Sequence, residues 1–256
     1  MGQDNTFIAE TSFTPAATAA WSLTDFPFLL QREAGLAAAS KGALAAHCLR
    51  ATEAVEGGTG WMTADFGLSF FYVLRGTVVL ATADGLAQML VADDAVTLPP
   101  GCDYEWRDFS DGFEALEITA SELVAAVPPG PAPIVHRGAA EDFVGGAGDR
   151  TDFTYRDFGF ADLTGDRLRI RVIRPIRQQV PATGWHAHTM GQFAFGIRGW
   201  AHVDFPGRPR LRLGVGDGLT VAAGTAHDAG DHSADFAMID ICLPATYSTE
   251  AVPNPA

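Results

Sequence analysis

Residues 184–200, GWHAHTMGQFAFGIRGW, contain side chains that could bind a metal ion together. His186 and His188 stand two residues apart, Gln192 follows four residues later, and His227 comes after a glycine-containing turn further along the chain. Neutral imidazole is the commonest biological metal ligand, and three imidazoles with one oxygen donor suit a divalent ion of iron, nickel, zinc, copper or manganese. Such a centre leaves positions open for water or a substrate.

A single β-strand would bring the first three of these side chains to one face. His186, His188 and Gln192 all have even numbers, and residues of equal parity share a face of an unbroken strand. The apolar side chains of FAFGI (193–197) would then point to the opposite face. We therefore expect one strand to carry three of the four candidate ligands.

Two further residues are candidates for lining a substrate pocket beside the metal. Met190 has the same parity as the candidate ligands, so we expect it to face the cavity. His202 shares this parity and lies just past Gly199, and we consider it as a residue that contacts the substrate or a ligand.

The sequence contains two copies of one pattern, and this repeat shows which elements must position the candidate ligands. Trp61 in TGWMTADFG matches Trp185 in TGWHAHTMG. Beyond one extra residue in the first copy, a constant offset of 123 residues relates the two copies, so that Asp94 corresponds to Asp217. A repeat held over about 50 residues indicates a duplicated structural unit.

The repeated unit has the pattern of short β-strands. In RLRIRVI (167–173) apolar residues alternate with arginine, as in a half-buried strand, and turn signals such as ADG, FPGRP and PPG separate further short apolar runs. Many short strands at this spacing favour a sandwich or barrel, so we predict an all-β chain. The expected organisation is an N-terminal arm (1–50), a first barrel (51–125), a Pro- and Gly-rich connector (126–150), a second barrel (151–248) and a tail (249–256).

The spacing of the candidate ligands resembles the two motifs of the cupin superfamily. The first motif has His-x-His, three or four residues, Glu, six residues and Gly, and the stretch 186–199 keeps this spacing. The second has Pro-x-Gly, two residues, His, three residues and Asn, and the stretch 222–231 keeps it with Ala in place of Pro and Asp in place of Asn. The resemblance covers both repeats and implies a bicupin: two tandem antiparallel jelly-roll barrels with a short N-terminal arm.

The two copies differ at the ligand positions. In the second copy His186, His188, Gln192 and His227 match the metal ligands of the family, with Gln192 in place of the usual Glu. In the first copy the corresponding residues are Met62, Ala64, Ser69 and Tyr104. We therefore expect one divalent metal ion in the second barrel and none in the first.

The resemblance implies a metal-dependent protein that acts on a small organic molecule. Because Gln192 removes the carboxylate that could serve as a base, and no other strong base is evident in the motif, we favour a mononuclear non-haem dioxygenase-type enzyme. Two alternatives stay open: a non-redox isomerase, lyase or cyclase, and a cupin that binds or senses a small ligand without turnover.

Charge and composition restrict the partners. The chain has 17 basic and 31 acidic residues and a net charge of −14, which argues against nucleic acid and against an anionic membrane surface as partners. The first ten residues lack the pattern of a secretory signal, and three well-separated cysteines fit a reducing compartment, so we expect a cytoplasmic protein. The cupin resemblance also implies a homodimer formed through barrel edges, whose exposed strands could pair.

Overall fold

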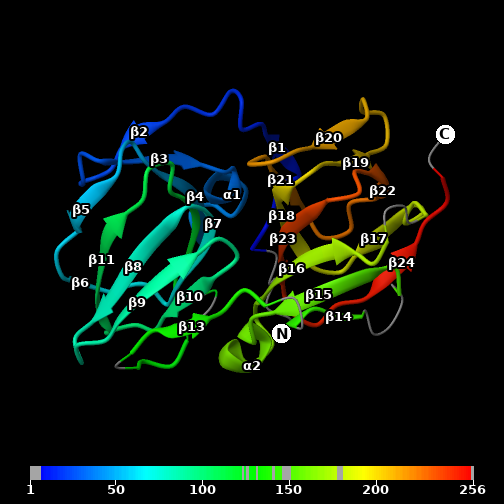
Figure 1. Cartoon of the computed structure of the whole chain (residues 1–256). Coiled ribbons are helices and arrows are strands. Elements are labelled where there is room, and N and C mark those ends of the chain that lie inside the picture. The colour runs from blue at the N-terminus through cyan, green and yellow to red at the C-terminus, as the bar shows by residue number, and fades with distance from the viewer. Residues whose placement is uncertain are drawn as a thin grey trace. The chain divides into compact units, whose positions relative to one another are not determined.

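The computed structural model describes residues 7–122, 124, 127–130, 132–139, 142–145, 151–177 and 181–254. Strands dominate these residues, and the helices among them are the short α1 (Leu36–Ala39) and α2 (Phe160–Thr164). The chain divides into two compact units (Figure 1). We name them the N-terminal barrel, residues 19–33 and 43–140, and the C-terminal barrel, residues 1–18, 34–42 and 141–256. The prediction of an all-β chain with antiparallel barrels is confirmed.

The N-terminal barrel consists of two antiparallel sheets. One has the strand order β13-β10-β7-β12-β4-β3-β2, and the other has the order β5-β11-β8-β9 with β6 paired to β11. The strands are β2 (Ser22–Leu23), β3 (Leu29–Glu33), β4 (Leu44–Ala51), β5 (Val55–Gly58), β6 (Met62–Thr63), β7 (Leu68–Arg75), β8 (Thr77–Thr82), β9 (Ala87–Val91), β10 (Ala95–Leu98), β11 (Asp103–Phe109), β12 (Glu114–Ala120) and β13 (Ile134–His136).

The C-terminal barrel repeats this plan with one large and two small sheets. The large sheet has the order β1-β21-β18-β23-β16-β15-β14, and β20-β19-β22 and β17-β24 form the others. The strands are β1 (Ser12–Thr14), β14 (Val144–Gly145), β15 (Phe153–Asp157), β16 (Arg169–Pro175), β17 (His186–His188), β18 (Gly191–Arg198), β19 (Ala201–Asp204), β20 (Leu211–Leu213), β21 (Gly218–Val221), β22 (Asp228–His232), β23 (Ala237–Leu243) and β24 (Thr249–Ala251).

Side-chain alternation gives β16 two different faces. In β16 the residues Ile170 and Val172 are fully buried, whereas Arg169 and Arg171 on the other face are partly exposed. The predicted half-buried strand at 167–173 is therefore present, although its two faces meet different surroundings. Arg171 turns out to lie on the side that carries the candidate ligands, as described below.

The structural repeat begins earlier in the chain than the sequence repeat. β3, α1 and β4 of the first copy have counterparts in β15, α2 and β16 of the second. The same correspondence relates β1 to β13, because Ser12 pairs with Thr220 of β21 and Ile134 pairs with Thr97 of β10. These segments share few identical residues, so the repeat could not be followed into them by eye.

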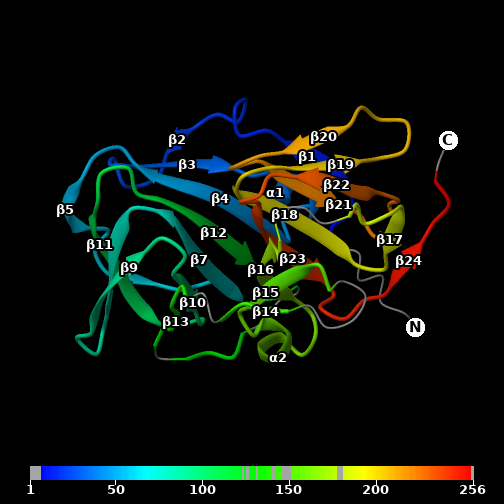
Figure 2. The ribbon, with the colours of Figure 1, turned by 45° about the vertical axis from the view of Figure 1, so that its right-hand side comes forward.

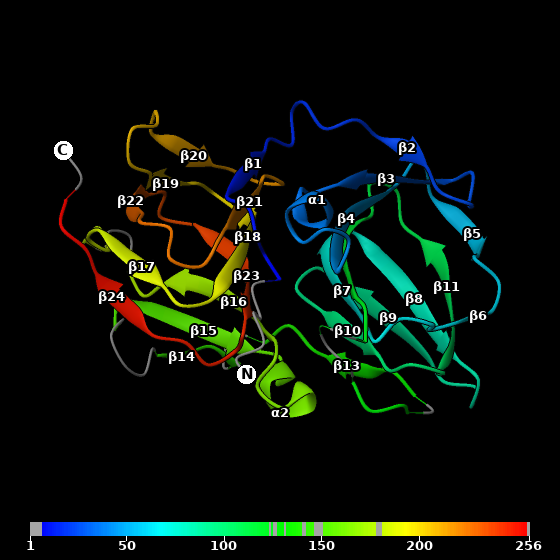
Figure 3. The same ribbon diagram turned by 180° about the vertical axis from the view of Figure 1, so that it is seen from behind.

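The two repeats exchange one strand each: β1 of the first repeat lies in the C-terminal barrel, and β13 of the second repeat lies in the N-terminal barrel. β1 precedes the strands of the N-terminal barrel in sequence but completes the large sheet of the C-terminal barrel, where it lies along β21 (Figures 1 and 3). β13 follows those strands and completes the N-terminal barrel beside β10. The expected arm 1–50 is thus divided between the units, and the expected connector 126–150 contains the two strands β13 and β14.

The conserved spacing of Asp94 and Asp217 in the repeat is explained by this exchange. Asp217 accepts hydrogen bonds from the backbone N–H of Ala16, at 2.7 Å, and of Gly214, at 2.8 Å. In the N-terminal barrel, Asp94 accepts equivalent bonds from Gly138 and Val91 at 2.8 and 3.1 Å. Each aspartate therefore ties the end of an exchanged strand to a turn of the barrel that receives it.

Two further observations concern the chain as a whole. Among the described residues, no helix is long and apolar enough to cross a membrane. Cys48, Cys102 and Cys242 are all free and buried.

The exchange predicts that Asp217→Ala loosens the N-terminal segment. The substitution leaves the N–H groups of Ala16 and Gly214 without their acceptor, which should lower the free energy of unfolding by about 1–3 kcal/mol. Hydrogen exchange should accelerate at residues 10–16. The control is Asp204→Ala, which removes a surface ion pair with Arg210 and should cost less than about 1 kcal/mol. Equal protection of residues 10–16 in both variants would contradict the proposed role of Asp217.

Candidate metal centre

Backbone hydrogen bonds join the segments that carry the three histidines. His186 and His227 form a reciprocal bridge, in which the N–H of each donates to the carbonyl of the other at 2.9 Å. The N–H of Gly224, which has a φ of 77°, donates to the carbonyl of His188 at 2.8 Å. The turn before His227 is thus bonded to the strand that carries the other two histidines.

Segments from both ends of the chain support this arrangement. β24 pairs with β17, so that Thr249 lies opposite His188, and the two strands run side by side in Figure 2. From the N-terminal segment, the Thr11 hydroxyl accepts the N–H of Ala222 at 2.9 Å and contacts the Thr225 hydroxyl at 3.0 Å. Residues 249–251, predicted as part of a tail, are in the structure a strand that holds the His-x-His segment.

The three imidazoles face one another at distances suited to a shared ion. The ring centroids lie 4.7 Å apart for His186 and His188, 4.3 Å for His186 and His227, and 5.1 Å for His188 and His227. One nitrogen of each ring can be chosen so that all three lie within 4.8 Å of one another. His186 and His227 are buried and His188 is half-buried, so the group is shielded from solvent but open on one side.

Hydrogen bonds at Nδ1 determine which nitrogen is left for a metal. His186 Nδ1 donates to the carbonyl of Gly184 at 2.6 Å, and His227 Nδ1 donates to the carbonyl of Thr225 at 2.9 Å. His188 Nδ1 bonds to the Thr249 hydroxyl at 2.9 Å. Metal-binding histidines characteristically use one ring nitrogen in this way, which leaves Nε2 as the ligand. The three Nε2 atoms therefore fit the requirements of a divalent metal.

Burial keeps the imidazoles of His188 and His227 neutral. Desolvation, assisted by the neighbouring histidines, lowers the pKa of His188 to about 4. Desolvation also lowers the pKa of His227 to about 4. Near pH 7 both rings therefore carry the lone pair that metal binding needs.

Gln192 lies on a different strand from His186 and His188, contrary to the expectation of one unbroken strand. The predicted unbroken strand is interrupted by a bend at residues 189–190: β17 belongs to the small sheet with β24, and β18 to the large sheet. From β18 the amide nitrogen of Gln192 donates to Asp240 Oδ1 at 2.5 Å. Among the described residues the amide oxygen has no hydrogen-bond partner, so Oε1 is the atom left to serve as a ligand.

A buried ion-pair cluster lies behind Gln192, and the sequence analysis did not assign it to the site. Asp240, fully buried, accepts a hydrogen bond from Arg171 Nε at 2.7 Å. Arg171 also donates to the Tyr247 hydroxyl at 3.0 Å, and the Tyr247 ring lies 5.5 Å from the ring of His188. Burial is the main reason that the pKa of Tyr247 rises to about 12, so its hydroxyl keeps its proton.

The sequence patterns around Arg171 and Asp240 do not connect the two residues. Arg171 belongs to the alternating run RLRIRVI, and Asp240 matches Glu117 at the repeat offset of 123 residues. The register shows that Arg171 and Asp240 are directly opposite on adjacent strands. Only that pairing identifies the two as partners.

The two candidate pocket residues, Met190 and His202, lie in different surroundings from each other. Met190 is 1% exposed and lies in the bend between β17 and β18. His202 does not join the other histidines: its Nδ1 contacts Asp231 at 3.0 Å and its ring lies 4.7 Å from that of Trp200. Val203, the next residue of β19, packs in the apolar interior, so alternation directs His202 to the outer face.

The N-terminal barrel has the same backbone frame with other side chains. Met62 pairs with Tyr104 as His186 pairs with His227, and the N–H of Gly101 donates to the carbonyl of Ala64 at 2.8 Å as Gly224 does to His188. The correspondences inferred from the sequence repeat are therefore those of the fold. Among the residues that the structure describes, the histidine triad is the one cluster of His, Cys, Asp and Glu arranged to hold a metal ion.

Removing the Thr249 hydroxyl should weaken metal binding. Thr249→Val frees the His188 ring from its orienting partner, and such changes typically lower metal affinity by about 10–100-fold. Chelator competition would measure the affinity. The control is Thr246→Val on the same segment, which loses an exposed hydrogen bond to Asp166 and should leave metal affinity unchanged. Equal affinity of the two variants would show that Thr249 does not orient the ring.

Replacing Gln192 by Glu should destabilise the metal-free protein. The carboxylate would remove the donor to Asp240 and place two acids in hydrogen-bond contact, at a cost of about 1–3 kcal/mol in the free energy of unfolding. Urea denaturation of the metal-free forms measures the difference. Gln192→Met, which removes the donor without adding charge, separates the lost hydrogen bond from the repulsion. A Gln192→Glu protein as stable as the unaltered one would contradict this account of the glutamine.

No family model matches the chain, and no curated protein matches it in sequence. Solved structures do match it. The protein YlbA from E. coli aligns with a TM-score of 0.71 at 11% identity over 93% of both chains. A putative glyoxylate-induced protein from Pseudomonas aeruginosa aligns at 0.66 and 13%, over 90% of this chain and 88% of that one.

A third match is an oxalate decarboxylase from Lactobacillus farciminis in complex with formate. It aligns with a TM-score of 0.60 at 10% identity, over 94% of this chain and 88% of that chain. At such identities the likeness concerns the fold, and the matched structures are cupins. With two repeats of one strand order and a histidine triad in the second, the chain has the fold of a two-barrel cupin.

Proposed function

We propose that the C-terminal barrel binds one divalent metal ion and that the protein uses it to convert a small organic molecule. The observation that carries the proposal is the convergence of three imidazoles whose Nδ1 atoms are already occupied. Gln192 Oε1 supplies a fourth donor, which is neutral. A metal held in this way keeps a larger positive charge than one bound by a carboxylate, and it has free positions for a substrate.

We favour a mononuclear dioxygenase-type enzyme because the site lacks a free base. Asp240 accepts bonds from Arg171 and Gln192, so its carboxylate is engaged. The remaining polar groups named at the centre are the histidines, which serve as ligands, and Tyr247, which keeps its proton. Iron, nickel or copper bound here would supply dioxygen activation, which does not require a protein base in the way that isomerisation does.

The chain's own residues have distinct parts in this proposal. Asp240 holds the amide of Gln192 so that its oxygen is the free atom, and Arg171 compensates the buried charge of Asp240. The Tyr247 hydroxyl, which accepts from Arg171, retains a proton that it can donate to an oxygen of the substrate. The expected substrates are small organic acids, enols or catechols that can bind through two oxygens.

A non-redox lyase is the second candidate, and one comparison favours it. Two structural neighbours bear names that refer to oxalate and glyoxylate, and another structure of oxalate decarboxylase, from Bacillus subtilis, is described as having Mn(II) centres. Manganese or zinc in the C-terminal barrel would favour decarboxylation or related Lewis-acid chemistry. A cupin that binds its ligand without turnover is the third possibility. A cytoplasmic location and a homodimer stay predictions.

Metal analysis tests the proposal directly. The protein, purified without a nickel column, should contain about one equivalent of a divalent metal, which His186→Ala/His188→Ala should lose because a tetrahedral or larger set is left with too few donors. His202→Ala is the matched control, since this histidine lies outside the triad. Iron, nickel or copper would be followed by oxygen-uptake measurements with enols and catechols. No metal in the unaltered protein, even after reconstitution, would refute the proposed centre.

A further inference from the structure

The interior of the N-terminal barrel contains a cavity at the place that corresponds to the metal centre. Its volume is about 290 Å³, near the lower end of the range of small-molecule sites. Met62 and Tyr104, the counterparts of His186 and His227, are among the residues that line it, together with Glu117. The barrel without metal ligands therefore retains a space where the other barrel has its triad.

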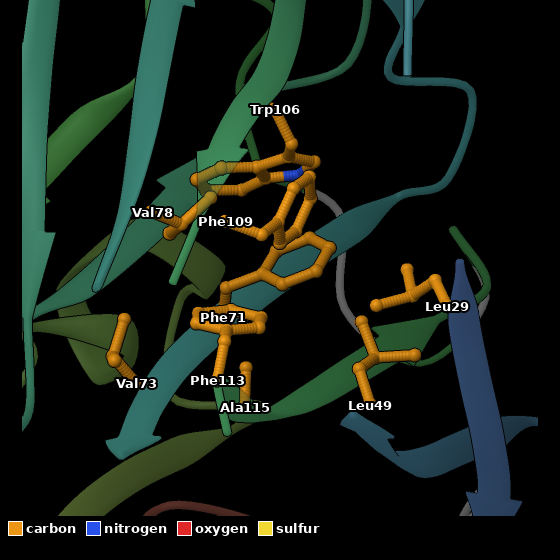
Figure 4. A pocket seen from close by; sticks show the side chains of 9 residues that line it. All are labelled: Leu29, Leu49, Phe71, Val73, Val78, Trp106, Phe109, Phe113 and Ala115. Atoms are coloured by element: carbon orange, nitrogen blue, oxygen red, sulfur yellow. The ribbon is translucent and has the colours of Figure 1, made fainter. Parts of the chain in front are cut away.

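Aromatic rings form much of the wall. Phe26, Phe71, Tyr104 and Trp106 line the cavity, with ring centroids 4.9 Å apart for Phe71 and Trp106 and 6.0 Å apart for Tyr104 and Trp106. Figure 4 shows Phe71 and Trp106 again on the adjoining side, where they meet Phe109 and aliphatic side chains. That adjoining region has space for about one water molecule, at about 20 Å³, so the larger cavity ends against a filled apolar core.

Several polar groups of the cavity wall lack a hydrogen-bond partner among the described residues, and the buried Nε1 of Trp106 is one of them. Among the described residues, neither the carboxylate of Glu117 nor the hydroxyl of Tyr104 makes a hydrogen bond or ion pair, although Tyr104 is only 8% exposed. Burial raises the pKa of Glu117 to about 7. Burial, with a smaller contribution from Glu117, also raises the pKa of Tyr104, and both side chains line the same cavity. Glu117 is half-buried and faces the cavity without a cation beside it, so its carboxylate is suited to receive a donor from a ligand.

In the C-terminal barrel, the acid at the corresponding position is paired with a cation. Asp240 occupies the position of Glu117 and is paired with Arg171, the residue opposite it on the adjacent strand. The residue opposite Glu117 is His47, and burial lowers the pKa of that imidazole, so it offers no permanent cation. The N-terminal barrel thus keeps the acid and lacks the guanidinium that compensates it.

The charge of the lining indicates which ligand would fit. Asp25 also lines the cavity, and none of the described lining residues is basic. The net charge of −14 raises the local concentration of cations around the protein. Aromatic faces attract cations, and carboxylate and phenol oxygens accept hydrogen bonds from N–H groups.

We propose that the N-terminal barrel has a metal-independent site for a small organic ammonium ion, with the ammonium group at Glu117 and Tyr104. The apolar body of the ligand lies against Phe71 and Trp106. The site is independent of the metal centre in the C-terminal barrel and does not rest on the function proposed for it.

Calorimetric titration with 2-phenylethylammonium at pH 8 tests this site, because Glu117 is largely ionised there. We expect one site per chain, with binding unaffected by a chelator and by His186→Ala/His188→Ala. Neutral 2-phenylethanol, of nearly the same shape, should bind at least about tenfold more weakly. Binding of the alcohol with equal affinity, or no binding of the ammonium at millimolar concentrations, would overturn the proposal.

Two variants with the same change in charge locate the ligand. Glu117→Gln should weaken 2-phenylethylammonium at least about tenfold, because the ion loses its buried partner. Glu105→Gln, on the same strand as Tyr104 but not among the cavity-lining residues, should leave the affinity unchanged. Glu117→Gln should fold at least as well at pH 8, since it removes a half-buried charge that has no cation beside it, and a denaturation midpoint verifies this. Equal affinity in the two variants would overturn the assignment.

Discussion

The reciprocal backbone bridge between His186 and His227 is the constraint on which the metal centre depends. Two hydrogen bonds fix the relative position of residues 41 apart in sequence, and the bond from Gly224 to His188 adds the third residue. Side chains at these positions must meet whatever their identity. The N-terminal barrel shows this, because the same frame there brings Met62 against Tyr104. The fold thus brings the same pair of positions together in each barrel, and the side chains there decide what chemistry is available.

A second constraint is the buried acid on the strand that follows this frame. A carboxylate inside a barrel is stable only with a cation or hydrogen-bond donors around it. Asp240 obtains both, from Arg171 and from the amide of Gln192. This explains why a glutamine, rather than the glutamate usual in the family, suits position 192: Asp240 needs a donor there. Among the described residues Glu117 has no such partners, so in the N-terminal barrel the acid at this position faces a cavity without a compensating cation.

How far the sequence predicts this structure depends on whether the information is local. Alternation in RLRIRVI and the spacing of His186, His188 and His227 are local patterns, and the strands and the triad follow them. The bend at residues 189–190 is also local, but parity alone cannot reveal a strand that changes sheets. The pairing of Arg171 with Asp240, and of Thr249 with His188, depends on register between distant strands. A residue such as Arg171, which looks solvated in its own segment, acquires its role only from that register.

Segments near both ends of the chain support the candidate ligands as well. Thr11 bonds to Ala222 and Thr225, which form the turn before His227, so a segment that precedes the N-terminal barrel in sequence supports a candidate ligand of the C-terminal barrel. β24 supports His188 from the other end. Neither barrel is therefore a continuous piece of chain, and a fragment that begins at the connector would lack β1 and the Thr11 contacts. The N-terminal segment is, for this reason, better regarded as part of the metal centre's support than as a separate arm.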